Sequence, residues 1–283
     1  MSHILTLACP NRPGIVAAIS GAIFAEAGNI AAAHQYDDPE TGRFFGRIRI
    51  TFGGDDRADA LRHRLAPIAA ELGMALTLRP RASRPRVLLL ASKFDHCLVD
   101  LLYRDRIGEL AMEVVGVVSN HPRAAYARLD IGEVPFHYLP VTPDTKPAQE
   151  ATILSLVRET GAELVVLARY MQILSNDLAT ALAARCINIH HSFLPGFKGA
   201  RLYHQAHARG VKLIGATAHY VTTDLDEGPI IAQDVEPITH ADTAEMLVAK
   251  GRDIERRVLA RAVAAHLDGR VLLNGHKTVV FGD

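Results

Sequence analysis

The chain has 283 residues, of which 49% are hydrophobic, and its 31 basic residues balance its 31 acidic ones. This balance gives no electrostatic reason to expect a nucleic acid partner, and no apolar run approaches the roughly twenty residues of a membrane-spanning helix. Cys9, Cys97 and Cys186 lie far apart without metal-ligand spacing, and the N-terminus lacks the features of a signal peptide. We therefore expect a reduced, cytoplasmic protein of two domains that binds a small molecule.

The first eighty residues predict a small α/β domain. Apolar residues recur there with a period of two residues in some segments and 3.6 in others. The first period indicates strands and the second indicates helices. The order is βαββαβ, typical of a ferredoxin-like fold, with strands expected at residues 3–9, 30–36, 43–52 and 74–78. One helix is expected to open at residues 10–14, with Asn11 as its cap, and to end at Gly28, and a second is expected at 61–72. In the strand 43–52 apolar residues alternate with Arg43, Arg47 and Arg49. One face should therefore pack, while the other face or the strand edge meets solvent or a second copy.

The sequence LACPNRPGIVAAISGAIFAEAGNI resembles the opening of ACT domains, regulatory modules that often bind amino acids at paired interfaces. Their turn commonly reads Asp-Arg-Pro-Gly, and Asn11 stands here in place of the Asp. The resemblance implies an amino-acid effector near Asn11, Gly14 and Asn29, and assembly as a homodimer or homotetramer. A purely structural dimerisation domain is an equal alternative, because a fold does not dictate a function.

Residues 80–85 (PRASRP) form a polar, proline-bracketed linker, which predicts domains at 1–80 and 86–283. Beyond the linker, apolar strands alternate with helical patterns. This alternation predicts βαβ units and a Rossmann-like, mostly parallel α/β sheet that is covered on both sides. Ligands of such sheets bind outside the carboxyl ends of the strands.

Polar side chains that can carry chemistry follow Cys186. Asn188 and His190 are two residues apart in an apolar strand, and strand side chains repeat with period two, so both should project from one face. The loop 222–229 follows the next apolar run and can bring Asp226 back toward them. The sequence therefore predicts an amide, an imidazole and a carboxylate around one small ligand.

The motif Asn188-x-His190, followed by SFLPGFKGA and by Asp226 in LDEGP, resembles the signature of the folate-dependent formyltransferases. The resemblance implies that Asn188, His190 and Asp226 are the catalytic residues. It also implies a pterin pocket, to which it assigns Met171, Ile173, Leu174, His219 and Leu225 as substrate-binding residues. For Met171 and Ile173, simple burial in the core is the alternative.

The chemistry that this resemblance implies is hydrolysis or transfer of a formyl group attached to an aryl nitrogen. Attack on the formyl carbonyl builds an oxyanion, which the Asn188 amide and a protonated His190 can stabilise. Asp226 would hold His190 in its working tautomer and position the attacking water, while His190 transfers protons. Neither a metal nor a redox cofactor is required.

Three features favour the deformylase branch of that family, which hydrolyses 10-formyltetrahydrofolate to tetrahydrofolate and formate in one-carbon metabolism and purine biosynthesis. An ACT-like domain precedes the formyltransferase-like one. Relatives that act on a phosphorylated amine carry a glycine-rich phosphate loop, whereas residues 91–97 (ASKFDHC) contain no glycine. The tail after Asp268 is too short for the extra domain of relatives that formylate initiator transfer RNA. The alternatives are formyl transfer to a small amine and a non-catalytic folate or amino-acid sensor.

Other motifs leave narrower alternatives. His204 and His207 can share one helical face and could join His190 in a metal site, although no recognised metal-ligand spacing is present. The basic residues of the segment 198–201 could contact an anionic substrate tail. Ser192 lacks the surrounding glycines of a nucleophile elbow, so we do not expect a serine nucleophile.

Overall fold

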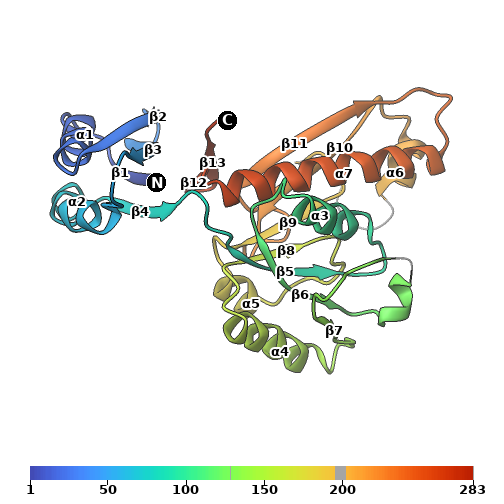
Figure 1. The fold of residues 1–283 in the computed structure, drawn as a ribbon. Helices are drawn as coiled ribbons and strands as arrows, with labels where there is room; N and C mark the ends of the chain where they lie inside the picture. Colours follow the sequence, from blue (N-terminus) through green and yellow to red (C-terminus); the bar gives the residue numbers. More distant parts are fainter. Residues whose placement is uncertain (128, 195–201, 283) are drawn as a thin grey trace. The chain divides into compact units, whose positions relative to one another are not determined.

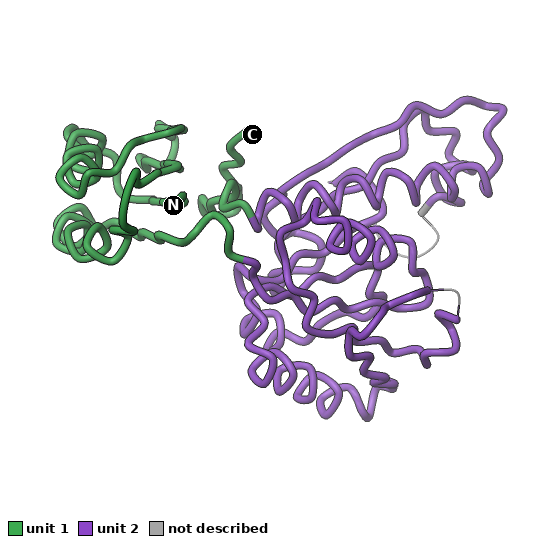
Figure 2. Tube along the Cα trace, viewed as in Figure 1, with its two compact units in different colours: residues 1–83, 268–283 green, residues 84–267 purple. Residues whose placement is uncertain are grey.

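The computed structural model describes residues 1–127, 129–194 and 202–282, and the chain divides into two compact units (Figure 2). Unit 1 comprises Met1–Ser83 with Asp268–Asp283, and unit 2 comprises Arg84–Leu267. The division after Ser83 falls within the linker expected from the sequence. The second domain was expected at 86–283. Its predicted C-terminal boundary is wrong, because residues 268–283 group with unit 1.

Unit 1 has the predicted order βαββαβ. Its elements are β1 (Ser2–Pro10), α1 (Ile15–Ala25), β2 (Gly28–Asp38), β3 (Arg43–Phe52), α2 (Ala58–Leu72) and β4 (Ala75–Pro80). The strands form one antiparallel sheet in the order β2-β3-β1-β4. Both helices bury their apolar stripes in a shared core with one face of this sheet, where Ile19, Leu65 and Ile50 are almost completely enclosed.

The arginine-bearing strand is β3, and it lies inside the sheet between β2 and β1. It therefore offers no free edge, and the expectation of self-association through a β3 edge is wrong. Arg47 was expected on a solvent or partner face but is only 6% exposed. Its guanidinium donates to the carbonyl oxygen of Asp268 and, at 2.8 Å, to the Asp268 carboxylate. The second face of β3 is thus occupied here by the chain's own C-terminal segment.

That segment forms a hairpin of β12 (Val271–Asn274) and β13 (Lys277–Val280). Gly275 takes φ 61° in its turn, a conformation that glycine adopts readily. The Asn274 amide donates to the Asp38 carboxylate at 2.6 Å, and Lys277 pairs with Glu40 at 2.6 Å. These polar contacts and the Arg47 pair explain why the hairpin belongs to unit 1.

Unit 2 is a mostly parallel α/β structure (Figure 1). Its elements are β5 (Arg86–Ala91), α3 (His96–Arg106), β6 (Glu113–Ser119), the 3-10 helix η1 (Arg123–Tyr126), β7 (Phe136–Tyr138), α4 (Lys146–Glu159), β8 (Leu164–Leu167), α5 (Asn176–Ala181), β9 (Cys186–His190), α6 (Leu202–Arg209), β10 (Leu213–Tyr220), β11 (Ile230–Pro237) and α7 (Ala244–Leu267). The seven strands run in the order β11-β10-β9-β8-β5-β6-β7, with β10 and β11 antiparallel to their neighbours.

Helices cover both faces of this sheet. Ile153 and Val157 of α4 and Leu178 of α5 pack with β5 and β8 in one buried cluster. Helices α3 and α7 contact each other, and α7 also packs on β9, β10 and β11 (Figure 1). No helix in the described part of the chain is long and apolar enough to cross a membrane.

The strand order reverses direction at β5. The chain passes from β5 to β6 on one side, and later from β8 to β9 on the other. The carboxyl ends of β5, β8 and β9 therefore meet at one edge of the sheet, where doubly wound folds bind their ligands. The loops after β5 and β8 are joined there, since the Met171 amide donates to Ser92 Oγ at 2.9 Å.

Candidate active site

Strand β9 presents both predicted polar residues to one pocket. Its residues alternate between the faces of the sheet, so Asn188 and His190 project on the same side. Asn188 pairs with Leu167 of β8 on one side and with His219 of β10 on the other. His190 is 5% exposed, because neighbouring strands and the following loop enclose it.

Asp226 comes from the loop that follows β10. Its Oδ2 lies 3.2 Å from Nδ1 of His190, and its Oδ1 lies 3.7 Å from Nε2 of His219. Burial would raise the pKa of the Asp226 carboxyl, but the interactions with His190 and His219 outweigh burial and hold this pKa well below its usual range. Asp226 is therefore a carboxylate at neutral pH.

His219 connects the amide to the carboxylate. Its Nδ1 lies 2.8 Å from the carbonyl oxygen of Tyr220, and a carbonyl only accepts, so Nδ1 carries a proton. In the neutral ring, Nε2 then accepts from the side-chain amide of Asn188 at 3.3 Å. This contact fixes which end of the Asn188 amide faces His219. At 3.7 Å, the approach of His219 to Asp226 is too long for a hydrogen bond.

These side chains line a cavity of about 270 Å³. All eight residues to which the sequence assigns catalysis or substrate binding contribute to its wall: Met171, Ile173, Leu174, Asn188, His190, His219, Leu225 and Asp226. Strands β9 and β10 and the segments after β8 and β10 supply them. The structure therefore brings the predicted residues together at the carboxyl ends of β8 and β9.

One side of the cavity is an exposed apolar wall. Met171 is 48% exposed, Ile173 61% and Leu225 52%. The alternative that Met171 and Ile173 belong to the core is therefore wrong. Large apolar side chains exposed together beside a polar floor are typical of a ligand-binding site.

Charged and aromatic residues to which the sequence assigned no role also line the cavity. Arg169 and His191 both line the cavity and are both 8% exposed. Burial and the nearby Arg169 lower the pKa of His191 to about 4, so this ring is neutral at pH 7. The rings of His190 and His191 are 5.5 Å apart. A histidine directly after the motif was visible in the sequence, but its burial was not.

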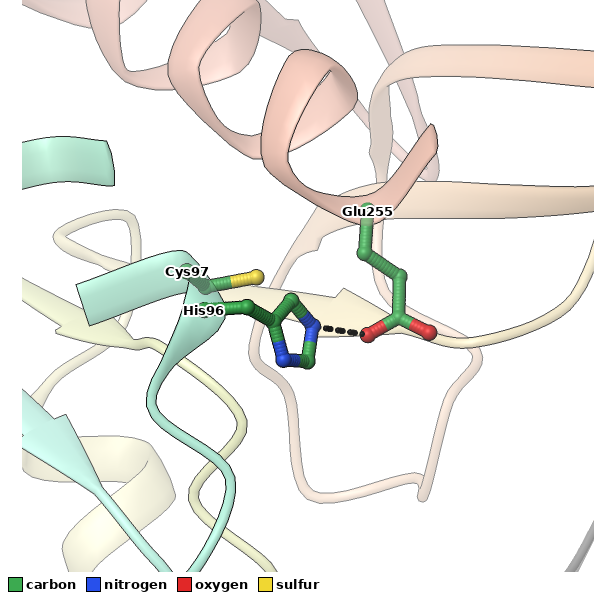
Figure 3. A group of neighbouring side chains, drawn as sticks. All are labelled: His96, Cys97 and Glu255. Carbon is green, nitrogen blue, oxygen red and sulfur yellow. Dashed lines mark hydrogen bonds and ion pairs between the residues drawn. The ribbon is translucent and has the colours of Figure 1, made fainter. Parts of the chain in front are cut away.

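A second group of titratable side chains contacts Arg169 through Glu255. In the described part of the chain, one set of three potential metal ligands is close together, namely His96, Cys97 and Glu255, whose ligand atoms lie within 4.8 Å of one another (Figure 3). Glu255 already interacts with His96 at 2.8 Å and with Arg169 at 3.1 Å. Burial, with a contribution from Glu255, raises the pKa of the Cys97 thiol well above its ordinary value, so sulfur is protonated. The group is therefore an internal ion-pair network that disfavours a cation.

The remaining predicted motifs lie elsewhere. His204 and His207 are exposed on α6, and within the described residues neither joins a group of potential metal ligands. The segment 198–201 lies outside the described residues. In unit 1, Asn11 and Gly14 line a surface hollow with Phe44, whereas Asn29 does not.

Comparison with known proteins identifies the family. Residues 85–263 match the Formyl transferase family. The chain is 52% identical to a formyltetrahydrofolate deformylase of Corynebacterium sp. (strain P-1), over 98% of this chain and 97% of that protein. It is 46% identical to one of Bacillus subtilis, over 98% of this chain and 93% of that protein.

Solved structures separate the branches of the family. The fold is similar to that of a formyltetrahydrofolate deformylase from Burkholderia mallei, with a TM-score of 0.92, 51% identity and 99% coverage of both chains. It is less similar to glycinamide ribonucleotide transformylase 1 from Symbiobacterium toebii, with a TM-score of 0.65, 29% identity, and coverage of 74% of this chain and 98% of that one. The chain therefore belongs to the formyl transferase family and, within it, to the formyltetrahydrofolate deformylases.

Proposed function

We propose that Asn188, His190 and Asp226 carry out the reaction of this family, the hydrolysis of 10-formyltetrahydrofolate to tetrahydrofolate and formate. The observation that carries the proposal is the geometry of the three groups. The Asp226 carboxylate lies 3.2 Å from the His190 ring, and both line one cavity with the Asn188 amide. Hydrolysis of a formyl group needs a carboxylate to position water, an imidazole to transfer protons and an amide to donate to the oxyanion.

The apolar wall supports binding of the pterin ring. Met171, Ile173, Leu174 and Leu225 can cover a flat aromatic ring and lose their exposed area in doing so. A cavity of about 270 Å³ is slightly smaller than most ligand pockets, which are roughly 300 to 1,000 Å³. It suits the ring end of a folate, and the rest of the substrate extends outward.

Asn188, His190 and Asp226 then act on the formyl group. Water attacks this carbon, and the carbonyl oxygen takes up negative charge. The Asn188 amide and a protonated His190 are the groups we assign to this oxygen. Nδ1 of His190 faces Asp226, so proton exchange with substrate falls to Nε2.

Proton transfer completes the reaction. Asp226 accepts a hydrogen bond from the attacking water and stabilises positive charge on His190. The new bond joins the water oxygen to the formyl carbon, and the bond from that carbon to the folate nitrogen breaks. His190 delivers a proton to the leaving nitrogen, and a proton from the attacking water replaces it on His190. The products are tetrahydrofolate, formate and one released proton.

The test of this function is formate release from 10-formyltetrahydrofolate by the purified protein. We expect one formate for each tetrahydrofolate formed. Adding glycinamide ribonucleotide should leave this ratio unchanged. Formylated ribonucleotide as the main product would instead assign the protein to transfer rather than hydrolysis.

We further propose that residues 1–80 assemble and regulate the enzyme as a homodimer or homotetramer in the cytoplasm. Strand β2 is an edge strand with Ile30 and Tyr36 exposed, so it is the edge that supports pairing with a second copy. The hollow formed by Asn11 and Gly14 supports binding of a small effector. The three cysteines are buried and unpaired, which suits a reducing compartment.

Sedimentation of the full-length protein and of Tyr36→Lys tests the assembly. A charge on an edge strand opposes edge pairing, so this variant should shift toward smaller species. Phe24→Lys, at a residue of α1 that is 83% exposed, is the control. A monomeric wild type would remove the assembly proposal, and formate release that no amino acid alters would remove the effector proposal.

A further inference from the structure

We propose that Phe94, Arg169 and Glu255 close the space beside the catalytic residues to an amine, and so restrict the acceptor of the formyl group to water. The inference rests on the proposed function, because it takes Asn188, His190 and Asp226 as the place where the formyl group is held. It concerns a different property of the site, which is the choice of the second substrate.

Phe94 and Arg169 lie in the loops at the carboxyl ends of two neighbouring strands. Phe94 follows β5 and Arg169 follows β8, and the strand order reverses between these two neighbouring strands. Doubly wound folds bind ligands in the crevice at this reversal. The backbone amide of Ser92 donates to the carbonyl oxygen of Arg169 at 3.2 Å, which draws the two loops together. In this chain, Arg169 lines the cavity beside this reversal.

Arg169 is the part of this group that reaches the cavity. It lines the cavity, as His191 does, and it is 8% exposed. Its backbone takes φ 63°, in the left-handed region that residues with a side chain rarely adopt. A buried charge on a strained backbone has two costs, and such outliers cluster at functional sites. Arg169 therefore needs a function that a smaller residue would not provide.

Glu255 of α7 holds Arg169 in this place. Its carboxylate is 1% exposed and lies 3.1 Å from Nε of Arg169. The same carboxylate accepts from Tyr203 at 2.6 Å and interacts with His96 at 2.8 Å (Figure 3). Burial would raise the pKa of Glu255, but the contacts with His96 and Arg169 outweigh it and lower this pKa. Glu255 is thus a carboxylate at neutral pH and pairs with the buried guanidinium of Arg169.

The Phe94 ring lies against the guanidinium of Arg169. Its ring centre lies 5.9 Å from the Arg169 guanidinium carbon and 5.7 Å from that of Arg252, both within the range of cation–π contacts. The ring is 43% exposed, so it forms the surface of this region. An amine that entered from this side would have to displace the ring and then the ion pair.

Water and an amine differ in the space that they need beside the formyl carbon. Water needs no more than the cavity beside His190, whereas an amine must place its own substituents next to the attacked carbon. Transfer to an amine would form a bond from the amine nitrogen to the formyl carbon and break the bond from that carbon to the folate nitrogen. The proton lost by the amine would pass to the folate nitrogen. The chemistry is parallel to hydrolysis, so the space for the acceptor decides the product.

The experiment uses the full-length protein with 10-formyltetrahydrofolate and saturating glycinamide, and it measures tetrahydrofolate, formate and N-formylglycinamide. One variant is Arg169→Gly with Glu255→Gln, which removes both charges together and places glycine where φ is positive. The other is Phe94→Ala, a change at a surface residue that folding tolerates. Tyr103→Ala, at a 57% exposed aromatic residue of α3, is the control.

For the wild type and the control we expect formate to equal tetrahydrofolate. In both test variants we expect the ratio of N-formylglycinamide to formate to rise by ~10-fold or more, the scale on which pocket shape discriminates substrates. Formate that still equals tetrahydrofolate would overturn the proposal. Loss of all tetrahydrofolate formation in both variants would also overturn it, because these residues would then be needed for hydrolysis itself.

A third variant separates this inference from the proposed function. His190→Ala is added to the Arg169→Gly and Glu255→Gln pair. Loss of both products supports the two proposals together. Formyl transfer to the amine at an unchanged rate would contradict the catalytic role of His190. It would not contradict the inference about the acceptor.

Discussion

Nδ1 of His190 lies 3.2 Å from Oδ2 of Asp226, although the first residue ends strand β9 and the second belongs to the loop beyond β10. The backbone makes this approach possible. Asp226 takes φ 57°, and at Gly228 a Cβ atom would lie 1.7 Å from the carbonyl oxygen of Tyr220. The pair therefore depends on a strained carboxylate residue and on a glycine that no other residue can replace.

Replacing Asp226 with Asn should reduce formate release by at least ~100-fold, the scale expected when a general acid-base group is impaired. Asn retains the shape of the side chain and accepts the left-handed backbone, so the melting temperature should stay near that of the wild type. Glu227→Gln changes the adjacent exposed carboxylate and should leave formate release unchanged. Near-wild-type turnover in Asp226→Asn would exclude a catalytic carboxylate at this position.

Gly228→Ala should reduce formate release strongly, because its Cβ would meet the Tyr220 backbone at 1.7 Å and displace the loop that carries Asp226. Gly21→Ala is the matched control. Nothing lies within 4 Å of a Cβ at this helix position, so alanine there should preserve activity and stability. Steady-state rates and thermal melts of both variants provide the measurement. Equal activity in the two variants would contradict the role given to Gly228.

His219 should act by aligning Asn188, since its Nε2 lies 3.3 Å from the Asn188 amide nitrogen. His219→Ala should lower kcat by ~10-fold or more while KM changes little, because misalignment of a charge-stabilising donor affects the transition state most. His219→Gln can accept from the same amide and should recover part of kcat. A change confined to KM would show instead that His219 contacts the substrate, as the family resemblance suggested.

The protein should lose stability as the pH falls from 6.5 toward 4. Burial and Arg169 lower the pKa of His191 from 6.5 to about 4, so within this window the unfolded chain binds a proton that the folded chain does not. The difference corresponds to about 3 kcal/mol of unfolding free energy. Melting temperatures of His191→Gln should therefore vary less between pH 6.5 and 4 than those of the wild type. Exposed His240→Gln should keep the wild-type slope, and parallel slopes for all three proteins would contradict this account.

Local sequence patterns were sufficient to predict the helices and strands and part of the active site. Asn188 and His190 could be placed on one face of a strand because period two is a property of the backbone. The linker near Ser83 could be found because its composition differs from that of the flanking strands. For Asp226, the sequence alone showed only a turn, and the family motif supplied its role.

Contacts between distant segments could not be predicted in this way. Glu255 reads in the sequence as one of many charges on an amphipathic helix, and only the packing of α7 shows that it is 1% exposed beside Arg169. The C-terminal hairpin could have been suspected from Gly275, because glycine suits the first position of a two-residue hairpin turn. Its placement in unit 1 depends on Arg47, a residue that looked like a solvated strand position.

The most direct test of the catalytic assignment is formate release by the His190→Ala variant. Purified wild type and variant are compared at saturating 10-formyltetrahydrofolate, and circular dichroism and thermal melts establish that the variant is folded. The account predicts a loss of at least ~100-fold in kcat with the fold retained. A folded variant that releases formate at nearly the wild-type rate would contradict it.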